Sequence, residues 1–242
     1  LVKYVNRTDR QTILQNGEAS VGTVEHLMAS LYALGIDNLR IELDGSEVPI
    51  LDGSAAPLVD LILKAGIEEQ SVEKNFYVLE ETFTFKDEDG SEIMALPSEE
   101  FEVSALIDYG SSVLGPQHAH LDKMVNFRDE IASARTFSFL RELEPLLDAG
   151  LIKGGDLNNA IVYVDQDIAP STLDKLKTAF GRDDVEVTQR GTLNNINLRF
   201  SNEAARHKLL DVVGDMALLG RPLKARIIAT KPGHGVNAEF TK

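Results

Sequence analysis

The segment from residue 202 to residue 219 constrains the fold more than any other part of the chain. Its composition predicts a long helix that ends at Gly220. His207, Asp211 and Asp215 follow one another at intervals of four residues, so they lie along one stripe of this helix. The remaining surface is mostly leucine, valine, alanine and methionine, which is too apolar for a helix in water. The fold must therefore enclose this helix and bring partners to its polar stripe.

Two carboxylates on an enclosed helix need compensation, and a divalent cation is one standard form of it. The chain has no cysteine, which excludes disulfides, cysteine nucleophiles and thiolate metal sites. A transition metal must therefore be held by nitrogen and oxygen. The five histidines are His26, His118, His120, His207 and His234. His118 and His120 stand in a predicted loop, and their spacing gives them a minor claim to a metal.

His207 and Asp211 can reach one ion from adjacent turns of a helix. His26 stands in the first turn of a second helix, predicted over residues 23 to 35, directly after Glu25. The three residues together would form a site with an open position, as catalytic metals have. Glu25 would then be a base beside the metal.

Other readings of these residues stay open. Two histidines and one carboxylate also form the facial triad of non-haem iron(II) oxygenases. A hydrogen bond on a helix face accounts for an isolated His207–Asp211 pair, and the N-terminal helix dipole accounts for Glu25. Gly233, His234 and Gly235 follow a predicted strand at 223 to 230, where glycines let a backbone approach a ligand.

Strands and helices are distributed as in an α+β protein. A charged, aperiodic stretch at 67 to 75 is the predicted linker between one domain at 1–70 and a second at 71–242. The other predicted strands are 39–43, 76–85, 93–96, 101–108 and 160–164, and the other predicted helices are 54–65, 139–149 and 171–180, with a short helix capped by Asn126.

Charge limits the partners. The 24 basic and 39 acidic residues give a net charge of −15, which argues against binding to nucleic acid or anionic lipid over the whole surface. No apolar run approaches the ~20 residues of a membrane-spanning helix, and the N-terminus is no signal peptide. We therefore expect a cytoplasmic protein. Because the chain opens on the strand-like Leu1 segment, we expect it to be a piece of a longer protein.

Several motifs occur in order over nearly the whole chain. They are VEHLMA at 24–29, GIDNL at 35–39, VPILDGSAAP at 48–57, ARTF at 134–137, GG at 154–155, RHKLLD at 206–211 with GD at 214–215, and KPGH at 231–234. Jointly they resemble the UDP-3-O-acyl-N-acetylglucosamine deacetylases of lipid A biosynthesis.

The resemblance implies two similar two-layer α+β domains with the active site between them. It implies a Zn2+ enzyme, with Fe2+ as the other candidate metal, that hydrolyses the N-acetyl group of a UDP-linked acylated amino sugar and releases acetate. The implied metal ligands are His26, His207 and Asp211. The implied catalytic residues are Glu25 as base, Thr136 at the oxyanion, and His234 oriented by Asp215. Residues near the substrate would be Lys208, Lys231, Phe137 and Glu142.

The sequence departs from the family pattern in two ways. The family has further strands before the point that matches Leu1 and a helix after the point that matches Lys242, so we expect an N-terminally incomplete first domain. The stretch from Val164 to Arg190 is longer than usual, as in forms fused to a 3-hydroxyacyl-carrier-protein dehydratase. A non-catalytic fragment that binds the nucleotide sugar is therefore an alternative. The sequence does not specify the oligomeric state.

Overall fold

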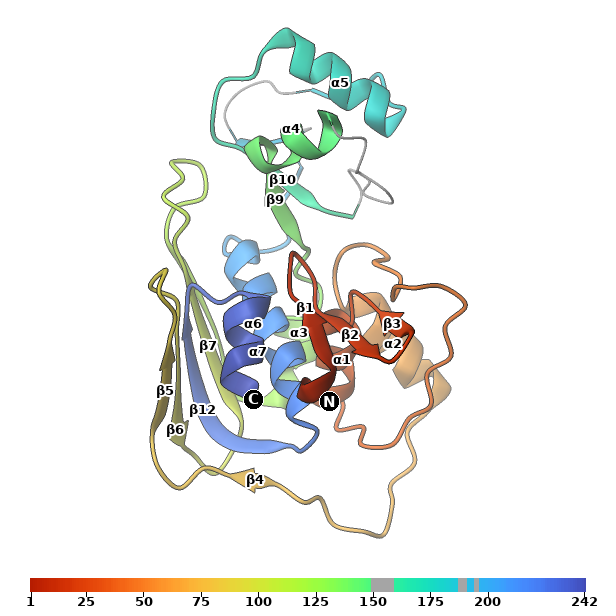
Figure 1. The fold of residues 1–242 in the computed structure, drawn as a ribbon, viewed down its shortest axis with the longest axis vertical. Coiled ribbons are helices and arrows are strands. Elements are labelled where there is room, and N and C mark those ends of the chain that lie inside the picture. The colour runs from red at the N-terminus through yellow and green to blue at the C-terminus, as the bar shows by residue number, and fades with distance from the viewer. Residues whose placement is uncertain (149–158, 187–190, 194–195) are drawn as a thin grey trace.

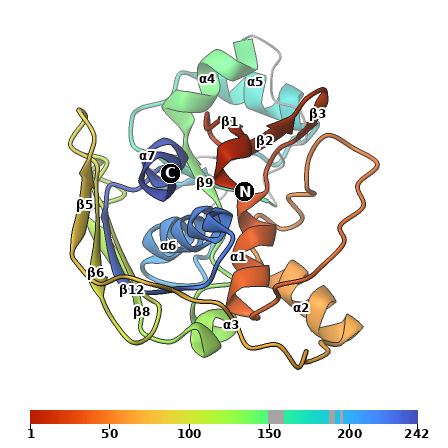
Figure 2. The ribbon, with the colours of Figure 1, turned by 60° about the horizontal axis from the view of Figure 1, so that its bottom comes forward.

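A computed structural model describes residues 1–148, 159–186, 191–193 and 196–242 of the chain. Helix α6 (Glu203–Met216) lies at the centre, with a six-stranded sheet on one side and helix α1 (Glu25–Ala33) on the other (Figures 1 and 2). Helices α4 and α5 lie together at one end of the molecule, above the rest in Figure 1. The predicted α+β class is confirmed.

The large sheet has the strand order β5-β6-β12-β7-β8, and β4 pairs with the start of β12. Its strands are β4 (Tyr77–Val78), β5 (Phe83–Lys86), β6 (Glu92–Pro97), β7 (Glu102–Ile107), β8 (Gln117–Leu121) and β12 (Leu223–Thr230). Side chains along β12 alternate between buried and partly exposed positions. This alternation leaves one face of the sheet apolar, and that face packs against α6.

Helix α6 is buried on nearly every side, as its apolar sequence predicts. It crosses α1 at Gly214, where an added Cβ would overlap the backbone carbonyl oxygen of Glu25. Glycine therefore allows the two backbones to touch. The crossing brings the start of α1 next to the polar stripe of α6. Helix α7 (His234–Thr241) packs against α6 as well.

The first 70 residues add a three-stranded antiparallel sheet and two helices. The strands are β1 (Val5–Arg7), β2 (Ile13–Asn16) and β3 (Ala19–Val21), and the second helix is α2 (Ala56–Ala65). The stretch 67–75 forms neither helix nor strand, as predicted for a linker. The division into domains at residues 1–70 and 71–242 stays a prediction.

A smaller unit is formed by residues 137–192, which precede α6 in the chain. Its elements are β9 (Phe137–Phe139), α4 (Leu140–Asp148), β10 (Ile161–Val164), α5 (Pro170–Phe180) and β11 (Gly191–Thr192). The strands form a three-stranded sheet in the order β11-β10-β9. The unit has its own small apolar core, made of Leu140, Val162, Val164, Leu176, Val185 and Leu193. The short helix α3 (Phe127–Glu130) precedes it.

The predicted elements at 54–65, 93–96, 101–108, 160–164, 171–180, 202–219 and 223–230 are confirmed within a few residues. The predicted strand at 39–43 is wrong: the segment forms no strand, and Leu39, Ile41 and Leu43 are exposed. Their alternation is typical of a strand, but no strand among the described residues pairs with it.

Three further expectations need correction. The single strand predicted at 76–85 is two strands, β4 and β5, that pair with different neighbours. His118 and His120 lie on β8 rather than in a loop, on its exposed face. Gly233 is followed by α7, so His234 opens a helix instead of standing in a turn.

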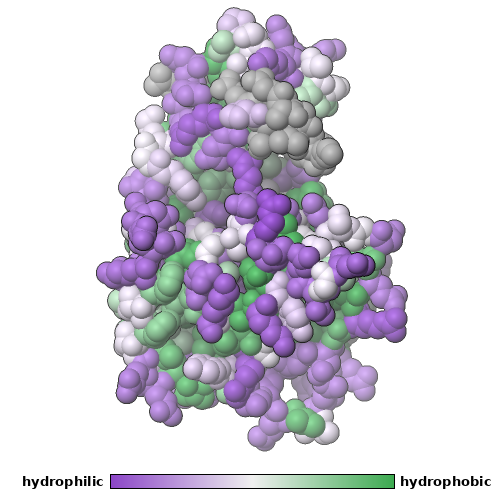
Figure 3. Space-filling model, in the orientation of Figure 1, coloured by the Kyte–Doolittle hydropathy of each residue, from purple (hydrophilic) through white to green (hydrophobic). Residues whose placement is uncertain are grey.

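The surface seen in Figure 3 is mostly hydrophilic, with hydrophobic residues scattered over its lower part. None of the described helices combines the length and apolar character that crossing a bilayer requires.

Candidate metal centre and active site

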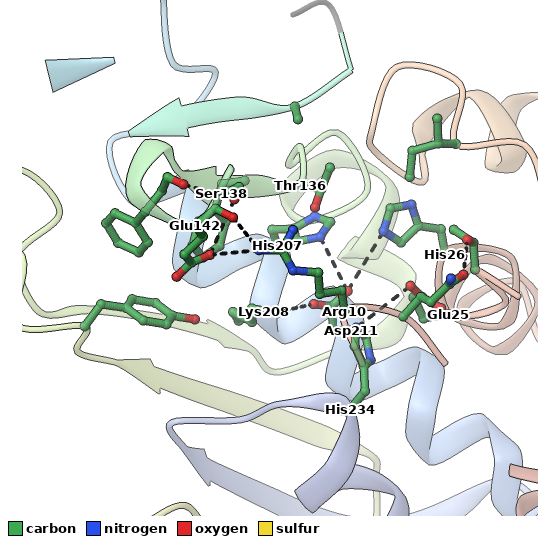
Figure 4. Close-up of a pocket in the computed structure, with 17 residues that line it drawn as sticks. Arg10, Glu25, His26, Thr136, Ser138, Glu142, His207, Lys208, Asp211 and His234 are labelled. Carbon is green, nitrogen blue, oxygen red and sulfur yellow. Dashed lines mark hydrogen bonds and ion pairs between the residues drawn. The ribbon is translucent and has the colours of Figure 1, made fainter. Parts of the chain in front are cut away.

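The two metal-site helices supply three buried ligands from two directions. Helix α1 supplies His26 from its first turn, and α6 supplies His207 and Asp211 from successive turns. The Nε2 atoms of His26 and His207 lie 3.9 and 3.4 Å from the same carboxylate oxygen, Asp211 Oδ1. One ligand atom from each residue lies within 4.8 Å of the others. Figure 4 shows the three side chains pointing toward one another.

The protonation states of these residues suit a divalent cation. Burial lowers the pKa of His26 to about 3, and the repulsion that would arise between protonated His26 and protonated His207 adds to the shift. Burial likewise lowers the pKa of His207, so both imidazoles are neutral at pH 7. Burial opposes ionisation of Asp211, but Lys208 and the histidines outweigh it and hold the pKa of that carboxyl below its ordinary value. The set is two neutral nitrogens and one anionic oxygen.

The hydrogen bonds leave the ligand atoms free. His207 Nδ1–H donates to the carbonyl oxygen of Ala134 at 3.1 Å, so its Nε2 lone pair faces Asp211. Asp211 Oδ1 is buried and has no hydrogen-bond partner among the residues that the structure describes, whereas Oδ2 accepts a bond of 2.9 Å from Lys208 Nζ. A buried carboxylate oxygen with no donor is costly unless a cation meets it. The residues therefore fit a metal.

Glu25 lies beside these ligands, and one of its oxygens is fixed. The backbone N–H of Thr12 donates to Oε2 at 3.1 Å, while Oε1 lies 3.8 Å from His234 Nε2. Burial raises the pKa of Glu25 to about 7; the charge of His234 opposes this shift and that of Asp211 adds to it. A carboxyl with such a pKa exchanges protons near neutral pH.

His234 is held by a network behind it. Its Nδ1 lies 2.9 Å from Asp215 Oδ2, which also accepts a bond of 2.8 Å from the side-chain amide of Asn237. The hydroxyl of Thr12 donates to the other oxygen of Asp215 at 2.7 Å. Burial lowers the pKa of His234, but Asp215 outweighs it and raises the pKa to about 9. His234 is therefore an imidazolium at neutral pH.

These groups line a cavity of about 430 Å³. Thr136 lines this cavity, and its backbone N–H donates to the carbonyl oxygen of Gly53 at 2.7 Å, which holds the segment in place. The rings of Phe137 and Tyr109 lie 5.7 Å apart and form part of the wall. Glu142 of α4 lies at the side opposite α1 (Figure 4).

The structure brings together most of the residues predicted for the site. Those that line the cavity are Glu25, His26, Thr136, Phe137, Glu142, His207, Lys208, Asp211 and His234. Asp215 lies behind His234, as expected for an orienting carboxylate. Lys231 does not line the cavity; it is exposed, and its backbone has a positive φ of 50°. His118 and His120 lie on the exposed face of the sheet, apart from the metal ligands.

Several residues of the site were missed in the sequence. Thr12 bridges Glu25 and Asp215, Asn237 holds Asp215, and Arg10 and Tyr109 line the cavity. Thr12 and Asp215 are 203 positions apart, and no spacing rule links positions so distant. Only the folded chain identifies these four residues.

The model of the family described as UDP-3-O-acyl N-acetylglycosamine deacetylase matches residues 1–178 and 176–242. A bifunctional enzyme LpxC/FabZ of Bacteroides thetaiotaomicron is 50% identical over 98% of this chain, and one of Porphyromonas gingivalis is 47% identical over the same share. This chain spans 52% of each of those proteins, about half their length.

A UDP-3-O-acyl-N-acetylglucosamine deacetylase of Myxococcus xanthus is 41% identical over 100% of this chain and 69% of its own length. The matches cover the segments that supply Glu25 and His26 as well as those that supply His207, Asp211 and His234. The chain therefore belongs to the UDP-3-O-acyl N-acetylglycosamine deacetylase family, a family of metalloenzymes.

Proposed function

We propose that this chain hydrolyses the N-acetyl group of a UDP-3-O-(3-hydroxyacyl)-N-acetylglucosamine and releases acetate, as a step of lipid A biosynthesis. The observation that carries the proposal is the buried cluster of two histidines and one aspartate with an unpartnered carboxylate oxygen, beside Glu25 and His234. The names of the relatives supply the substrate class. The cytoplasm as the place of reaction is part of the proposal and rests on the resemblance.

We propose zinc as the metal, with iron(II) as the alternative. His26, His207 and Asp211 would hold it. When bound, zinc supplies a Lewis acid that acidifies water and polarises a carbonyl group. Three protein ligands leave a coordination position open, as this chemistry requires.

The proton transfers fall to Glu25 and His234. Glu25 takes a proton from the attacking water through Oε1, the oxygen that Thr12 does not hold. As the new C–O bond forms and the amide C–N bond breaks, the imidazolium of His234 donates the proton on Nε2 to the departing amine. The bond from Nδ1 to Asp215 directs Nε2 toward Glu25. Acetate and the free amine are the products.

Other side chains of the cavity stabilise and orient the substrate. The hydroxyl of Thr136 would donate to the oxyanion that develops on the acetyl carbonyl. Lys208, Phe137 and Glu142 would contact the substrate, and the Lys208 ammonium lies 5.8 Å from the centre of the Phe137 ring. We propose Lys231 as a further substrate-binding residue because the family resemblance implies it; its positive φ marks a constrained backbone position.

A paired measurement of metal content and turnover tests the proposal. Glu25→Ala should retain the metal, because Glu25 is not a ligand. Its rate of acetate release should fall about a hundredfold or more, the usual contribution of a positioned base. The matched control is Glu18→Ala, since Glu18 is exposed and does not line the cavity. Loss of metal with Glu25 would show that it is a ligand and not a base.

The same preparation separates the alternatives. A binding fragment would take up UDP and release no acetate from the acylated substrate. An iron(II) oxygenase would require iron and a 2-oxo acid, whereas a hydrolase works with zinc alone. Absence of a stoichiometric metal after supplementation would overturn the proposal.

A further inference from the structure

Arg10 reaches the cavity from a loop that the rest of the site fixes in place. The loop joins β1 to β2, and Arg10 has a positive φ of 64°, an unfavourable conformation for a residue with a side chain. Two residues later, Thr12 is fully buried and bonded to both Glu25 and Asp215. The anchor at Thr12 therefore maintains the strained backbone at Arg10, which carries its guanidinium to the cavity.

The partner of Arg10 lies on the opposite side of the cavity. Arg10 Nη2 lies 3.6 Å from Glu142 Oε2 and donates to the backbone oxygen of Glu142 at 3.5 Å (Figure 4). The side chains of Arg10 and Glu142 are 53% and 46% exposed. Long, exposed ion pairs of this kind contribute little free energy and exchange partners readily. The guanidinium is therefore available to a competing anion.

The other cationic side chains that line the cavity are committed to buried carboxylates. Lys208 donates to Asp211 at 2.9 Å, and His234 is 2.9 Å from Asp215. Among the described lining residues, Arg10 is the cation whose carboxylate partner is solvent-accessible. An anionic substrate meets a chain of net charge −15, so a local cation at the rim is needed for its capture.

We propose that Arg10 binds the diphosphate of the nucleotide sugar, exchanging Glu142 for phosphate oxygens when the substrate enters. The inference rests on the proposed function for the identity of its ligand. A guanidinium presents a planar fork of N–H donors that matches phosphate oxygens in a bidentate manner, and a diphosphate offers more negative charge than one carboxylate. Arg10 thereby contributes to substrate affinity from the first 70 residues, across the cavity from α4.

Calorimetric titration of the metal-loaded protein with UDP tests the inference, with uridine as the probe without phosphate. Arg10→Gln should weaken UDP binding about tenfold or more, as expected for the loss of a charged hydrogen-bonding partner, and leave uridine binding unchanged. The matched control is Arg7→Gln, which removes the same charge from an exposed residue of β1. Its UDP affinity should equal that of the unmodified chain.

Two more variants keep the test decisive. Arg10→Lys keeps the charge without the fork and should give an intermediate affinity; it also replaces Arg10→Gln if that variant does not fold. Glu142→Gln removes the charge that competes for Arg10. We expect the contacts of Glu142 with the full substrate to lie on the acylated sugar, which UDP lacks, so UDP should bind more tightly. UDP affinity that is unchanged in both Arg10 variants, or absent from the unmodified chain, would overturn the inference.

Acetate release by the same proteins distinguishes this inference from the proposed function. In the deacetylase reaction, Arg10→Gln should raise KM much more than it lowers kcat, because Arg10 is proposed to contact the diphosphate and not the atoms of the amide that react. An unmodified chain that hydrolyses the substrate while Arg10→Gln binds UDP normally would reject the role of Arg10 alone. An unmodified chain that binds UDP through Arg10 but releases no acetate would reject the proposed function alone.

Discussion

Asp215 does not line the cavity and is not one of the three metal-site residues, yet it sets the protonation state of His234. It is fully buried, accepts three hydrogen bonds and opposes the desolvation of His234. Without its charge, burial would favour the neutral form of His234. The proton that His234 is proposed to donate therefore depends on a carboxylate one layer behind the cavity.

The first prediction concerns Asp215→Asn. We expect the alkaline limit of kcat/KM to move from about pH 9 toward the ordinary histidine pKa of ~6.5 or below, with metal content unchanged. The reaction requires protonated His234, so kcat/KM falls as pH rises through the pKa of that residue. A pH profile of kcat/KM measures it, and the exposed Asp9→Asn is the control. An alkaline limit at the same pH in both variants would contradict the role.

The same pair has a signature in stability. Because the pKa of His234 is raised in the folded chain, the ion pair contributes its full stability below pH ~6.5 and loses it as pH rises through about 9. The free energy of unfolding of the unmodified chain should therefore exceed that of Asp215→Asn by more at pH 6 than at pH 10. Denaturant unfolding at the two pH values measures this difference.

At the residue scale, the sequence predicts those contacts that follow from a short spacing within one helix. His207 and Asp211 are one helical turn apart, so their shared direction follows from helix geometry alone. The meeting of His26 with that pair depends on the α1–α6 crossing, and it was predicted by combining residue chemistry with the family resemblance. Thr12 and Asn237 carry no motif, because their function is a hydrogen bond to a distant residue.

Among the secondary-structure elements, the close contact of α1 and α6 determines the ligand geometry. Gly214→Ala would place a methyl group against the carbonyl of Glu25 and push the helices apart. We expect this clash, at ~1–3 kcal/mol, to outweigh the ~1 kcal/mol that alanine gains over glycine in a helix. The variant should unfold at lower denaturant and bind metal more weakly, since His26 moves away from Asp211.

Gly45→Ala is the matched control for Gly214→Ala, because nothing lies within 4 Å of an added Cβ at Gly45. Urea unfolding and metal titration of both variants provide the measurement. Equal stability and metal affinity in Gly214→Ala and the unmodified chain would show that the helices can separate without cost, contrary to the close backbone contact in the structure.

The incorrect element predictions also have physical causes. The alternation at 39–43 predicts a strand, yet a strand exists only where a neighbour accepts its backbone hydrogen bonds. Most of residues 76 to 85 favour β structure, but pairing with β12 and with β6 divides them into two strands on either side of Glu80 and Glu81. Helix α7 was missed because two glycines next to His234 favour a turn, whereas packing against α6 stabilises the helix.

Over the whole molecule, the cavity lies where the main apolar core meets the smaller one. The metal-site helices pack into the main core, whereas α4, α5 and β10 enclose the smaller core around Leu176. Phe137 and Phe139 pack into the main core, whereas Glu142 reaches the cavity from α4, which covers the smaller core. A substitution in one core should therefore affect metal binding and substrate binding differently. No local pattern in the sequence shows this separation, since it depends on which apolar residues meet in space.

The last prediction uses Leu176→Ala to separate the two cores. Removing this fully buried side chain should lower the free energy of unfolding of the smaller unit by ~2–5 kcal/mol. Hydrogen exchange should become faster in β10 and α5 and remain slow in α1 and α6, with metal content preserved and KM raised. Leu61→Ala on α2, where the residue is 59% exposed, should change none of these quantities. If hydrogen exchange in α6 accelerated as much as in β10 and α5, the two cores would unfold together. The cavity wall and the metal site would then form one cooperative structure.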